Sequence, residues 1–475
     1  MKRVLIVSPH FPPVNAADMH RVRMVLPFLR ENGWEAEVLA VRSEAVAAPK
    51  DEWLEAGLPE DVPIHRVKAL GLGWSRVPGL GTLGWRALPA TQRAGDALLR
   101  EKKFDLVYFS STQWPVHLAG PHWKRRSGVP FAMDYQDPWV NDYYRRHPEV
   151  TPPGGRLRYA AADALSRWTE PRVLRECSGY TSVSEAYPAD LTRRYPWSAT
   201  IPHVVMPFPG SERDFERVRS EDVRQTQFDP QDGKRHWVYV GRGGKDMETA
   251  AHALFRAVAE HARTSSGFRG QVVMHFIGTS YAPAGTGRAT ISPIAAEYGI
   301  SEMVREHPDR IPYSETLRCL LDATSIIALG SNDASYTASK IYPCLLAGKP
   351  LLVVCHEQSG VVRLMEEVGG GVCVTFGGER SGDAAENIRS RWLECGAYKT
   401  TTSLNRARFE RYMERASAAA LARFWGAVGP LDYGTTGLRD DGTERPRVAD
   451  CWLTGPLDYG TTSPRDCVTL VDTKR

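Results

Sequence analysis

A serine and a lysine, Ser339 and Lys340, stand at the start of a predicted helix whose apolar residues continue to Leu346. The chain then breaks at Gly348 and enters a predicted buried strand. A helix start gathers unpaired N–H groups and the positive end of the helix dipole, so it suits an anion. A hydroxyl and an ammonium group placed there suit a diphosphate. The alternative interpretation is an ordinary serine N-cap beside a surface lysine.

A second predicted phosphate-binding turn follows an earlier strand and reads VGRGGK, from Val240 to Lys245. Arg242 suits bidentate contact with a phosphate, and Lys245 offers a compact positive charge. Gly241 and Gly243 would let a ligand approach the backbone closely. The alternative is a solvated basic turn. Two such turns in one half of an α/β chain predict a nucleoside-diphosphate ligand.

A carboxylate, Asp137, comes shortly after the predicted strand Pro130–Asp134, at the edge where ligands of parallel sheets bind. A group of this kind can orient or deprotonate an acceptor hydroxyl. Asp137 is equally suited to cap a turn or helix that begins near Trp139, so that alternative stays open.

Short apolar runs alternate with helical patterns along the chain, which predicts parallel, doubly wound sheets. The predicted strands of the first half are Val4–Ser8, Glu35–Val41, Ile64–Val67, Asp105–Ser110, Pro130–Asp134, Gly179–Ser184 and Ile201–Met206. Those of the second half are Trp237–Gly241, Val272–Gly278, Ser325–Leu329 and Leu351–Cys355. Helices are predicted over Val22–Asn32 and, at the end of the second half, over Arg406–Val428. On the helix after the first loop, His20, Arg21 and Arg23 are expected on a solvated face, with contact to an acceptor phosphate or carboxylate as the alternative.

These patterns predict an α/β chain with two Rossmann-like domains, at 1–206 and 227–428. A polar, strand-poor linker is expected between them at 207–226. Residues 429–475 contain the sequence GPLDYGTT twice and have no helical or strand period. We expect this tail to be disordered.

The charge composition is balanced, with 60 basic and 56 acidic residues and a net charge of +4, so we expect no nucleic-acid partner. No run approaches the roughly 18 apolar residues of a membrane span, and the first apolar stretch is too short for a signal peptide. The eight cysteines lack CxxC spacing and are expected as reduced thiols. A soluble, cytoplasmic protein is therefore expected.

The order and spacing of these motifs resemble the GT-B glycosyltransferases, most closely the retaining family-4 group. The opening VLIVSPHFPPVNAADMHRVRMVLPFLRENGWEAEVLAV is similar to that family's first strand, loop, helix and second strand. The sequences VYVGR, SKIYPCLLAGKPLLVV and DYQDPW resemble its diphosphate turn, its SKxxE-type helix and the DxRDPW element of one subgroup. The resemblance covers roughly residues 1–428.

The resemblance implies a nucleotide-sugar donor held mostly by the C-terminal domain and an acceptor held mostly by the N-terminal domain. It implies that Arg242 and Lys245 stabilise the departing diphosphate, which makes them, with Asp137, the candidate catalytic residues. It also places Ser339 and Lys340 on the donor diphosphate.

Two departures from the family pattern stand out. Asn15 and Ala16 occupy the first loop, where the family carries a Gly-Gly pair; small residues keep room for the donor, and Asn15 is a candidate contact. Two family glutamates that contact the donor sugar and ribose correspond to Ser335 and Pro343. Glu357, after the next strand, is the candidate substitute, with a plain loop carboxylate as the alternative.

The resulting interpretation is a glycosyltransferase that moves a sugar from a nucleoside-diphosphate sugar to an acceptor hydroxyl. Retention at the anomeric carbon and independence of metals and other cofactors are what the resemblance implies. The acceptor is left open as a glycan, a lipid-linked molecule or a small molecule, in bacterial polysaccharide or glycoconjugate assembly or in secondary metabolism. The basic runs Lys124–Arg126 and Arg145–Arg146 suit a lipid phosphate at the inner face of the membrane, or are plainly solvated.

Two other functions remain as alternatives. An inactive nucleotide-sugar-binding module of the same fold is favoured by the missing glutamates. A sugar-nucleotide 2-epimerase of related fold would require acid–base groups clustered between the domains.

Overall fold

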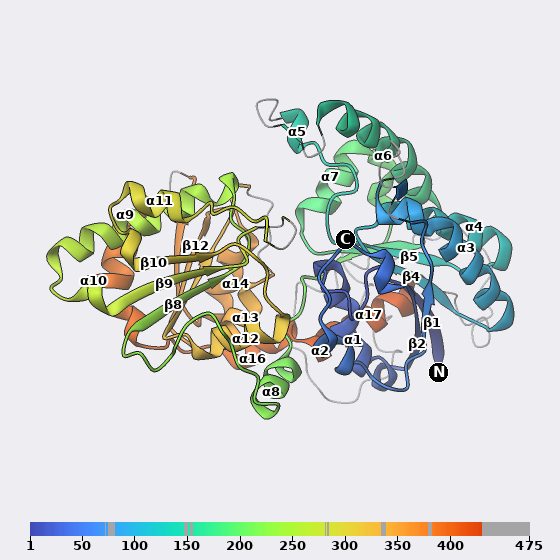
Figure 1. Cartoon of the computed structure of the whole chain (residues 1–475). Helices are drawn as coiled ribbons and strands as arrows, with labels where there is room; N and C mark the ends of the chain where they lie inside the picture. The colour runs from blue at the N-terminus through green and yellow to red at the C-terminus, as the bar shows by residue number, and fades with distance from the viewer. Residues whose placement is uncertain are drawn as a thin grey trace, which may run out of the picture.

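The computed structural model describes residues 1–71, 73–74, 81–146, 151–152, 155–280, 282, 285–333, 339–378 and 382–429. Within them the chain forms two separate parallel β-sheets with helices around each (Figure 1). The tail that was predicted to be disordered begins at Gly429, and all of it after this residue lies outside the described residues. Ser335 also lies outside them.

The N-terminal sheet has seven parallel strands in the order β3-β2-β1-β4-β5-β6-β7. They are β1 Lys2–Val7, β2 Trp34–Val41, β3 Ile64–Val67, β4 Leu106–Ser110, β5 Phe131–Tyr135, β6 Gly179–Ser182 and β7 His203–Val205. Each overlaps one of the seven strands predicted from the sequence. The strand order reverses between β1 and β4, where loops at the carboxyl ends diverge and leave room for a ligand.

The C-terminal sheet has six parallel strands in the order β10-β9-β8-β11-β12-β13. They are β8 Arg235–Val240, β9 Val272–Ile277, β10 Val304–His307, β11 Ser325–Leu329, β12 Leu351–His356 and β13 Val372–Phe376. The edge strands β10 and β13 were not predicted. β10 reads VREH and has no apolar run, because only Val304 of this edge strand is buried in the core.

Helices surround both sheets. In the N-terminal half they are α1 His20–Val25, α2 Glu52–Ala56, α3 Leu83–Glu101, α4 Ala119–Ser127, α5 Tyr143–Arg146, α6 Arg156–Glu176, α7 Ala186–Arg194 and α8 Glu212–Ser220. The rest are α9 Glu248–Thr264, α10 Phe268–Gln271, α11 Ser292–Glu297, α12 Tyr313–Asp322, α13 Ile341–Leu346, α14 Gly360–Val368, α15 Ala384–Ile388, α16 Arg406–Phe409 and α17 Glu414–Val428. None of the helices in the described part of the chain is both long and apolar enough to cross a bilayer.

Each sheet is apolar on both faces. In β1, Val4 and Ile6 join one buried cluster, whereas Leu5 and Val7 join another on the opposite face. Successive side chains of a strand point to opposite faces, so this division places a core on either side of the sheet. The doubly wound architecture predicted from the sequence is therefore confirmed.

The predicted helix Val22–Asn32 is shorter than expected. α1 ends at Val25, and two 3-10 turns, Leu26–Phe28 and Arg30–Asn32, follow it. Pro27 lies in the first of these turns, and its missing N–H interrupts the α-helical hydrogen bonding.

The closing helix differs from its prediction in both continuity and location. Residues 406–428 were predicted as one helix of the C-terminal domain, but the extended residue Met413 separates α16 from α17. α17 packs on the N-terminal sheet, where Trp425 is fully buried against Trp34 and Tyr108. An apolar helix face does not encode which sheet it covers, so the sequence left this assignment undetermined.

The predicted strand-poor linker at 207–226 contains α8. Ser211 caps this helix by accepting a hydrogen bond from the backbone N–H of Asp214, at 3.2 Å. Phe215 and Val218 of α8 are buried in the C-terminal core. The segment therefore connects the domains and also packs as part of one of them.

Buried charges join the two halves across α1 and α8. Arg23 of α1 donates to Asp214 of α8, with Nη1 2.8 Å from Oδ1, and both side chains are buried. The backbone N–H of Tyr313 donates to the Asp51 carboxylate at 2.7 Å, which ties α12 to the start of α2. Because both contacts involve a buried carboxylate that is shielded from water, they hold the connection in one geometry.

Replacing Trp425 with alanine is expected to lower the free energy of unfolding by about 3–5 kcal/mol, because it removes a large side chain from a closed core. Urea unfolding followed by circular dichroism measures the change. Gly426→Ala is the matched control in α17, since a Cβ there meets no atom within 4 Å. Equal stability of the two variants would contradict the packing of α17 on the N-terminal sheet.

Candidate functional site

The loop after β1 carries the predicted residues Asn15 and Ala16. Asn15 is 6% exposed, and its backbone N–H donates to the carbonyl of Pro49 at 2.8 Å. Ala16 is partly buried and precedes the 3-10 turn Ala17–Met19. This loop is thus fixed by backbone contacts, and its small residues lie at the carboxyl edge of the sheet.

A histidine–aspartate pair closes the same loop. His10 Nδ1 lies 2.8 Å from Asp18 Oδ1, and Asp18 also accepts hydrogen bonds from Ser111 and Thr112 after β4. Burial alone would lower the pKa of His10, but the charge and hydrogen bond of Asp18 raise it above its ordinary value. Burial opposes ionisation of Asp18, yet His10 and Thr112 together lower its pKa.

The predicted acceptor-side carboxylate, Asp137, lies just beyond β5, where it is open to solvent on one side but crowded by the surrounding chain. Desolvation by the surrounding chain and repulsion from Asp18 raise the pKa of Asp137 to about 6, while the positive charge of Arg242 acts in the opposite direction. Arg242 belongs to the C-terminal half. Asp137 therefore lies within electrostatic reach of both the loop after β1 and the loop after β8.

Arg242 is held by a carboxylate four residues later. Its Nη1 donates to Asp246 Oδ1 at 2.7 Å, and its Nη2 donates to Oδ2. Ser331 Oγ, after β11, also donates to Asp246 at 2.7 Å. Burial opposes ionisation of Asp246, but the contacts with Arg242 and Ser331 lower its pKa. The guanidinium is thereby oriented at the carboxyl end of β8.

Two positions of this turn require glycine, because a larger side chain at either one would collide with a neighbouring residue. Gly241 has a φ of 151°, and a Cβ there would lie 2.7 Å from Lys340 Nζ. At Gly243 a Cβ would lie 2.3 Å from Thr290 Oγ1. Both glycines permit close packing around the turn. Lys245 is exposed in the 3-10 turn Lys245–Met247.

Lys340 precedes α13 and meets the turn after β8. Its Nζ donates to Tyr239 Oη and lies 4.2 Å from the centre of the Tyr239 ring. Desolvation, with repulsion from Arg242, lowers the pKa of Lys340 to about 7. The structure thus brings together Lys340, Arg242 and Gly241. Ser339 is exposed next to Lys340, and α13 itself is only 6 residues long.

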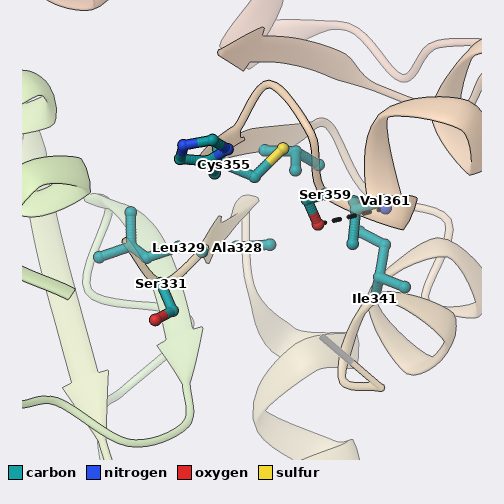
Figure 2. Close-up of a pocket in the computed structure, with 10 residues that line it drawn as sticks. Ala328, Leu329, Ser331, Ile341, Cys355, Ser359 and Val361 are labelled. Carbon is teal, nitrogen blue, oxygen red and sulfur yellow. Dashed lines mark hydrogen bonds between the residues drawn. The ribbon is translucent and has the colours of Figure 1, made fainter. Parts of the chain in front are cut away.

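A pocket adjoins this cationic pair. Figure 2 shows the ends of β11 and β12 meeting α13 and α14 around it. Its lining is Ala328, Leu329, Gly330, Ser331, Ile341, Val353, Cys355, His356, Ser359 and Val361. Most of these side chains are apolar, and the shared residue Ser331 connects the pocket to Asp246.

Glu357, the candidate substitute for the missing glutamates, lies between two pocket residues. His356 and Ser359 line the pocket. The Glu357 carboxylate lies over Gly378, where an added Cβ would be 1.7 Å from it. Glu357 is therefore next to the pocket but packed against the loop after β13.

The helix α1 was expected to present His20, Arg21 and Arg23 to solvent, and this expectation is wrong for both arginines. Arg21 is fully buried against Asp134, with Nε 2.7 Å from Oδ2, and Arg23 is buried against Asp214. Their carboxylate partners are distant in sequence, so helical periodicity could not reveal them.

Sequence reasoning missed four side chains that shape the site. His10 and Asp18 were passed over because only their contact in the folded loop distinguishes them. Tyr239 occupies a strand position typical of core residues. Asp246 did carry a signal, since it lies four residues after Arg242, a spacing at which opposite charges pair on a helical turn.

Taken together, the site has acidic and basic sides. His10, Asp18 and Asp137 follow strands of the N-terminal sheet, whereas Arg242 and Lys340 belong to the C-terminal half. Two cations next to one another suit a diphosphate, and a carboxylate that ionises near neutral pH suits proton or hydroxyl handling.

Part of the chain matches a known domain family. Residues 20–209 match the model of the glycosyl transferase 4-like domain. A comparison with characterised protein sequences gave no significant match.

Three solved structures share the fold. HepE of Anabaena, crystallised with UDP-glucose, aligns over 89% of this chain and 99% of its own, with a TM-score of 0.56 and 13% identity. A glycosyltransferase of Rickettsia africae ESF-5 aligns over 89% of this chain and 98% of its own, with a TM-score of 0.53 and 11% identity. A UDP-forming α,α-trehalose-phosphate synthase of Burkholderia xenovorans aligns over 89% of this chain and 97% of its own, with a TM-score of 0.51 and 12% identity.

The fold is therefore GT-B, with two Rossmann-like domains. The match over residues 20–209, within this fold, confirms the predicted resemblance to the family-4-like glycosyltransferases for that part of the chain.

Replacing Asp18 with asparagine is expected to lower the pKa of His10 below its ordinary value of about 6.5, because burial persists while the carboxylate charge is lost. Histidine ring signals followed by NMR across pH measure this shift. The wild-type pair stabilises the fold below pH 6.5, and His10's contribution is lost as the pH rises through its raised pKa.

Ser111→Ala serves as the control, since it removes one hydrogen bond from Asp18 but leaves the charge in place. An unchanged His10 pKa in the Asp18 variant would contradict the pairing.

Proposed function

We propose that the protein transfers a sugar from a nucleoside-diphosphate sugar to an acceptor hydroxyl. The observation that carries this proposal is the pair of cations, Arg242 and Lys340, adjacent at the carboxyl end of β8 and the start of α13. Two like charges held next to each other are unfavourable in the empty protein. A bound diphosphate would relieve that repulsion, and in doing so would raise the pKa of Lys340.

The same pair would assist departure of the diphosphate. Negative charge grows on the phosphate oxygens as the bond to the sugar breaks, and fixed positive groups stabilise that charge. A guanidinium carries five N–H groups, and the contacts of Arg242 with Asp246 use two of them. Asp246 would therefore orient Arg242 while phosphate contacts form. Lys245 follows Arg242 in the same turn, and Ser339 directly precedes Lys340. Both are exposed, and both are proposed as further phosphate contacts.

The pocket beside α13 is proposed to receive the nucleoside. Its apolar lining suits a base, and its position next to Ser331 would leave the diphosphate at Arg242. HepE, which shares the fold, was crystallised with UDP-glucose. Asn15, Ala16, Gly241 and Gly243 would border the sugar and the phosphates, with Glu357 beside the nucleoside.

Asp137 is proposed to hold the acceptor hydroxyl. Its carboxylate lies within electrostatic reach of Arg242 and ionises near pH 6, so it can accept a hydrogen bond at neutral pH. The pair formed by His10 and Asp18 would fix the loop on the other side of the acceptor.

The finer features follow from the family resemblance. We propose retention at the anomeric carbon and a reaction without a metal ion, with Arg242 and Lys340 supplying the positive charge. The acceptor would be a glycan, a lipid-linked molecule or a small molecule of bacterial polysaccharide, glycoconjugate or secondary-metabolite synthesis. The setting would be the cytoplasm, at or near the inner face of the membrane.

A nucleotide-sugar-binding protein without transfer activity is the second candidate. The observation that favours it is Pro343, the third residue of α13, which supplies no carboxylate where the family has one. The two candidates share the donor site and differ only in turnover.

A donor screen tests the shared site. One of UDP-, GDP-, ADP- or dTDP-sugars, with EDTA present, is expected to raise the melting temperature of the protein. Lys340→Ala should weaken that donor's binding about tenfold to a hundredfold, because a hydrogen bond to a charged group is lost. Thermal shift and calorimetry measure both effects.

Lys234→Ala is the matched control, since it removes an exposed lysine of the same domain. Unchanged donor affinity in Lys340→Ala would contradict the diphosphate site. Binding without sugar release or transfer to any acceptor would favour the inactive module.

The pH profile of kcat/KM tests the ionisable groups. Activity is expected to rise through pH 6 as Asp137 ionises, and to fall above pH 7 as Lys340 loses its proton. The profile of kcat/KM reports these groups in the free enzyme. Rates of product formation across the pH range give the measurement.

Each limb has its own diagnostic variant. Asp137→Asn should remove the acidic limb, and Lys340→Arg should remove the alkaline limb because a guanidinium stays charged. A limb that persists unchanged in its variant would exclude that residue as its source.

A further inference from the structure

Two cysteine thiols meet on neighbouring strands of the C-terminal sheet. Cys355 lies near the carboxyl end of β12 and Cys373 near the start of β13, and their sulfur atoms are 4.0 Å apart. In the sheet register Cys373 lies opposite Val353, two residues before Cys355, so both cysteines point to the same face. Both are free thiols. The structure therefore holds a reduced pair of sulfur atoms that are close enough to interact.

The two thiols differ in their exposure to solvent. Cys355 is 2% exposed and lines the pocket beside α13, where Figure 2 shows it among the labelled side chains. Cys373 is half-buried on β13, which forms one edge of the sheet. A small oxidant can therefore reach Cys373 from the edge of the sheet. The pair connects the outside of the domain with the proposed nucleoside pocket.

The surroundings of Cys373 favour its thiolate. A hydrogen bond from Cys355 lowers the pKa of Cys373, and the charge of Arg391 acts in the same direction, while burial and the charge of Glu366 oppose them. Arg391 is held beside the strand, because its Nη1 donates to the Cys373 carbonyl at 3.0 Å. The same contact between the thiols, together with burial, raises the pKa of Cys355. Cys373 is thus the nucleophile of the pair, since the thiolate is the reactive form.

The packing around Cys355 transmits a change in its position to the pocket. A Cβ added at Gly330, another lining residue, would lie 2.8 Å from the Cys355 Cβ. The Gly330 N–H also donates to the carbonyl of Val354 at 2.7 Å. A disulfide requires its sulfur atoms to be about 2.05 Å apart. Forming one would therefore draw Cys355 toward β13, away from Gly330 and from the pocket wall.

We propose that Cys355 and Cys373 form a reversible oxidation site for peroxides, and that their disulfide alters the wall of the adjacent pocket. The Cys373 thiolate attacks one oxygen of hydrogen peroxide, the O–O bond breaks, and Cys373 becomes a sulfenic acid while the other oxygen leaves as water after protonation. The Cys355 sulfur then attacks the Cys373 sulfur, and the hydroxyl group leaves as water with the thiol proton. The two thiols lose two electrons, and the peroxide is reduced to two waters. A dithiol reductant restores both thiols by exchange.

Peptide mapping of the full chain, without donor, tests the oxidation. Hydrogen peroxide should protect two thiols from iodoacetamide and produce a linked peptide pair that contains Cys355 and Cys373, and dithiothreitol should reverse both changes. Trypsin leaves Cys344 and Cys355 in one peptide, so Cys344→Ala is the matched control and should still form the link. Dimedone should trap a sulfenic acid on Cys373 in Cys355→Ser at least about tenfold faster than on Cys355 in Cys373→Ser, because the thiolate reacts. Melting temperatures check that all variants fold.

Amide hydrogen exchange measures the effect on the pocket. The Gly330 amide should exchange at least about fivefold faster in the oxidised protein than in the reduced protein, because its hydrogen bond to Val354 is weakened. Peroxide should cause no such change in Cys373→Ser. Thiols that stay open to iodoacetamide, a link made by Cys344, or a Gly330 amide that does not respond to the disulfide would each overturn the proposal.

The outcome is separable from that of the donor screen, because both measurements are made without nucleotide. If the proposed function holds, the oxidised protein should bind the donor found in the screen at least about tenfold more weakly than the reduced protein. Failure of the proposed function would leave the linked peptide and the faster exchange of Gly330 intact. Absence of the disulfide would leave donor affinity the same before and after peroxide treatment.

Discussion

The carboxylate of Asp134 is the constraint on which the N-terminal half depends. It is fully buried at the end of β5 and accepts hydrogen bonds from Arg21 of α1, from Ser110 of β4 and from Thr181 of β6. Arg21 in turn donates to the carbonyl of Met206, just before the linker, at 2.6 Å. Removing one partner of such a pair leaves an uncompensated buried charge, at a cost of about 3–5 kcal/mol. One side chain thus fixes the strand ends, the first helix and the chain's exit toward the second domain.

The contacts of Asp134 also position the loops of the candidate site. Because the ends of β1, β4 and β5 are held together, the loop with His10 and Asp18 and the segment with Asp137 converge at one edge of the sheet. The opposing half brings Arg242 and Lys340. The pKa of Asp137 and that of Lys340 both move toward neutral, since each group is desolvated beside a like charge. Groups poised in this way are typical of functional sites.

The two halves are connected more intimately than a simple linker would require. The chain leaves the N-terminal sheet at β7, enters the C-terminal core through α8 and returns through α17 to the first sheet. Glu414 at the start of α17 accepts from the backbone N–H groups of Glu212 and Arg213, and burial raises its pKa to about 7. The contacts of Glu414 and the pair formed by Arg23 and Asp214 hold the two halves together, and they thereby position the acidic side of the site against the basic side.

Local sequence determined the alternation of strands and helices, the two-domain GT-B class and the basic turns at Arg242 and Lys340, because periodicity and turn chemistry act over a few residues. Tertiary structure decided what depends on partners far apart in the chain. It buried Arg21 where a solvated face was expected, moved Trp425 and its helix to the first sheet, and paired His10 with Asp18. The physical reason is that burial and charge pairing are properties of the folded neighbourhood, and no single segment encodes its neighbours.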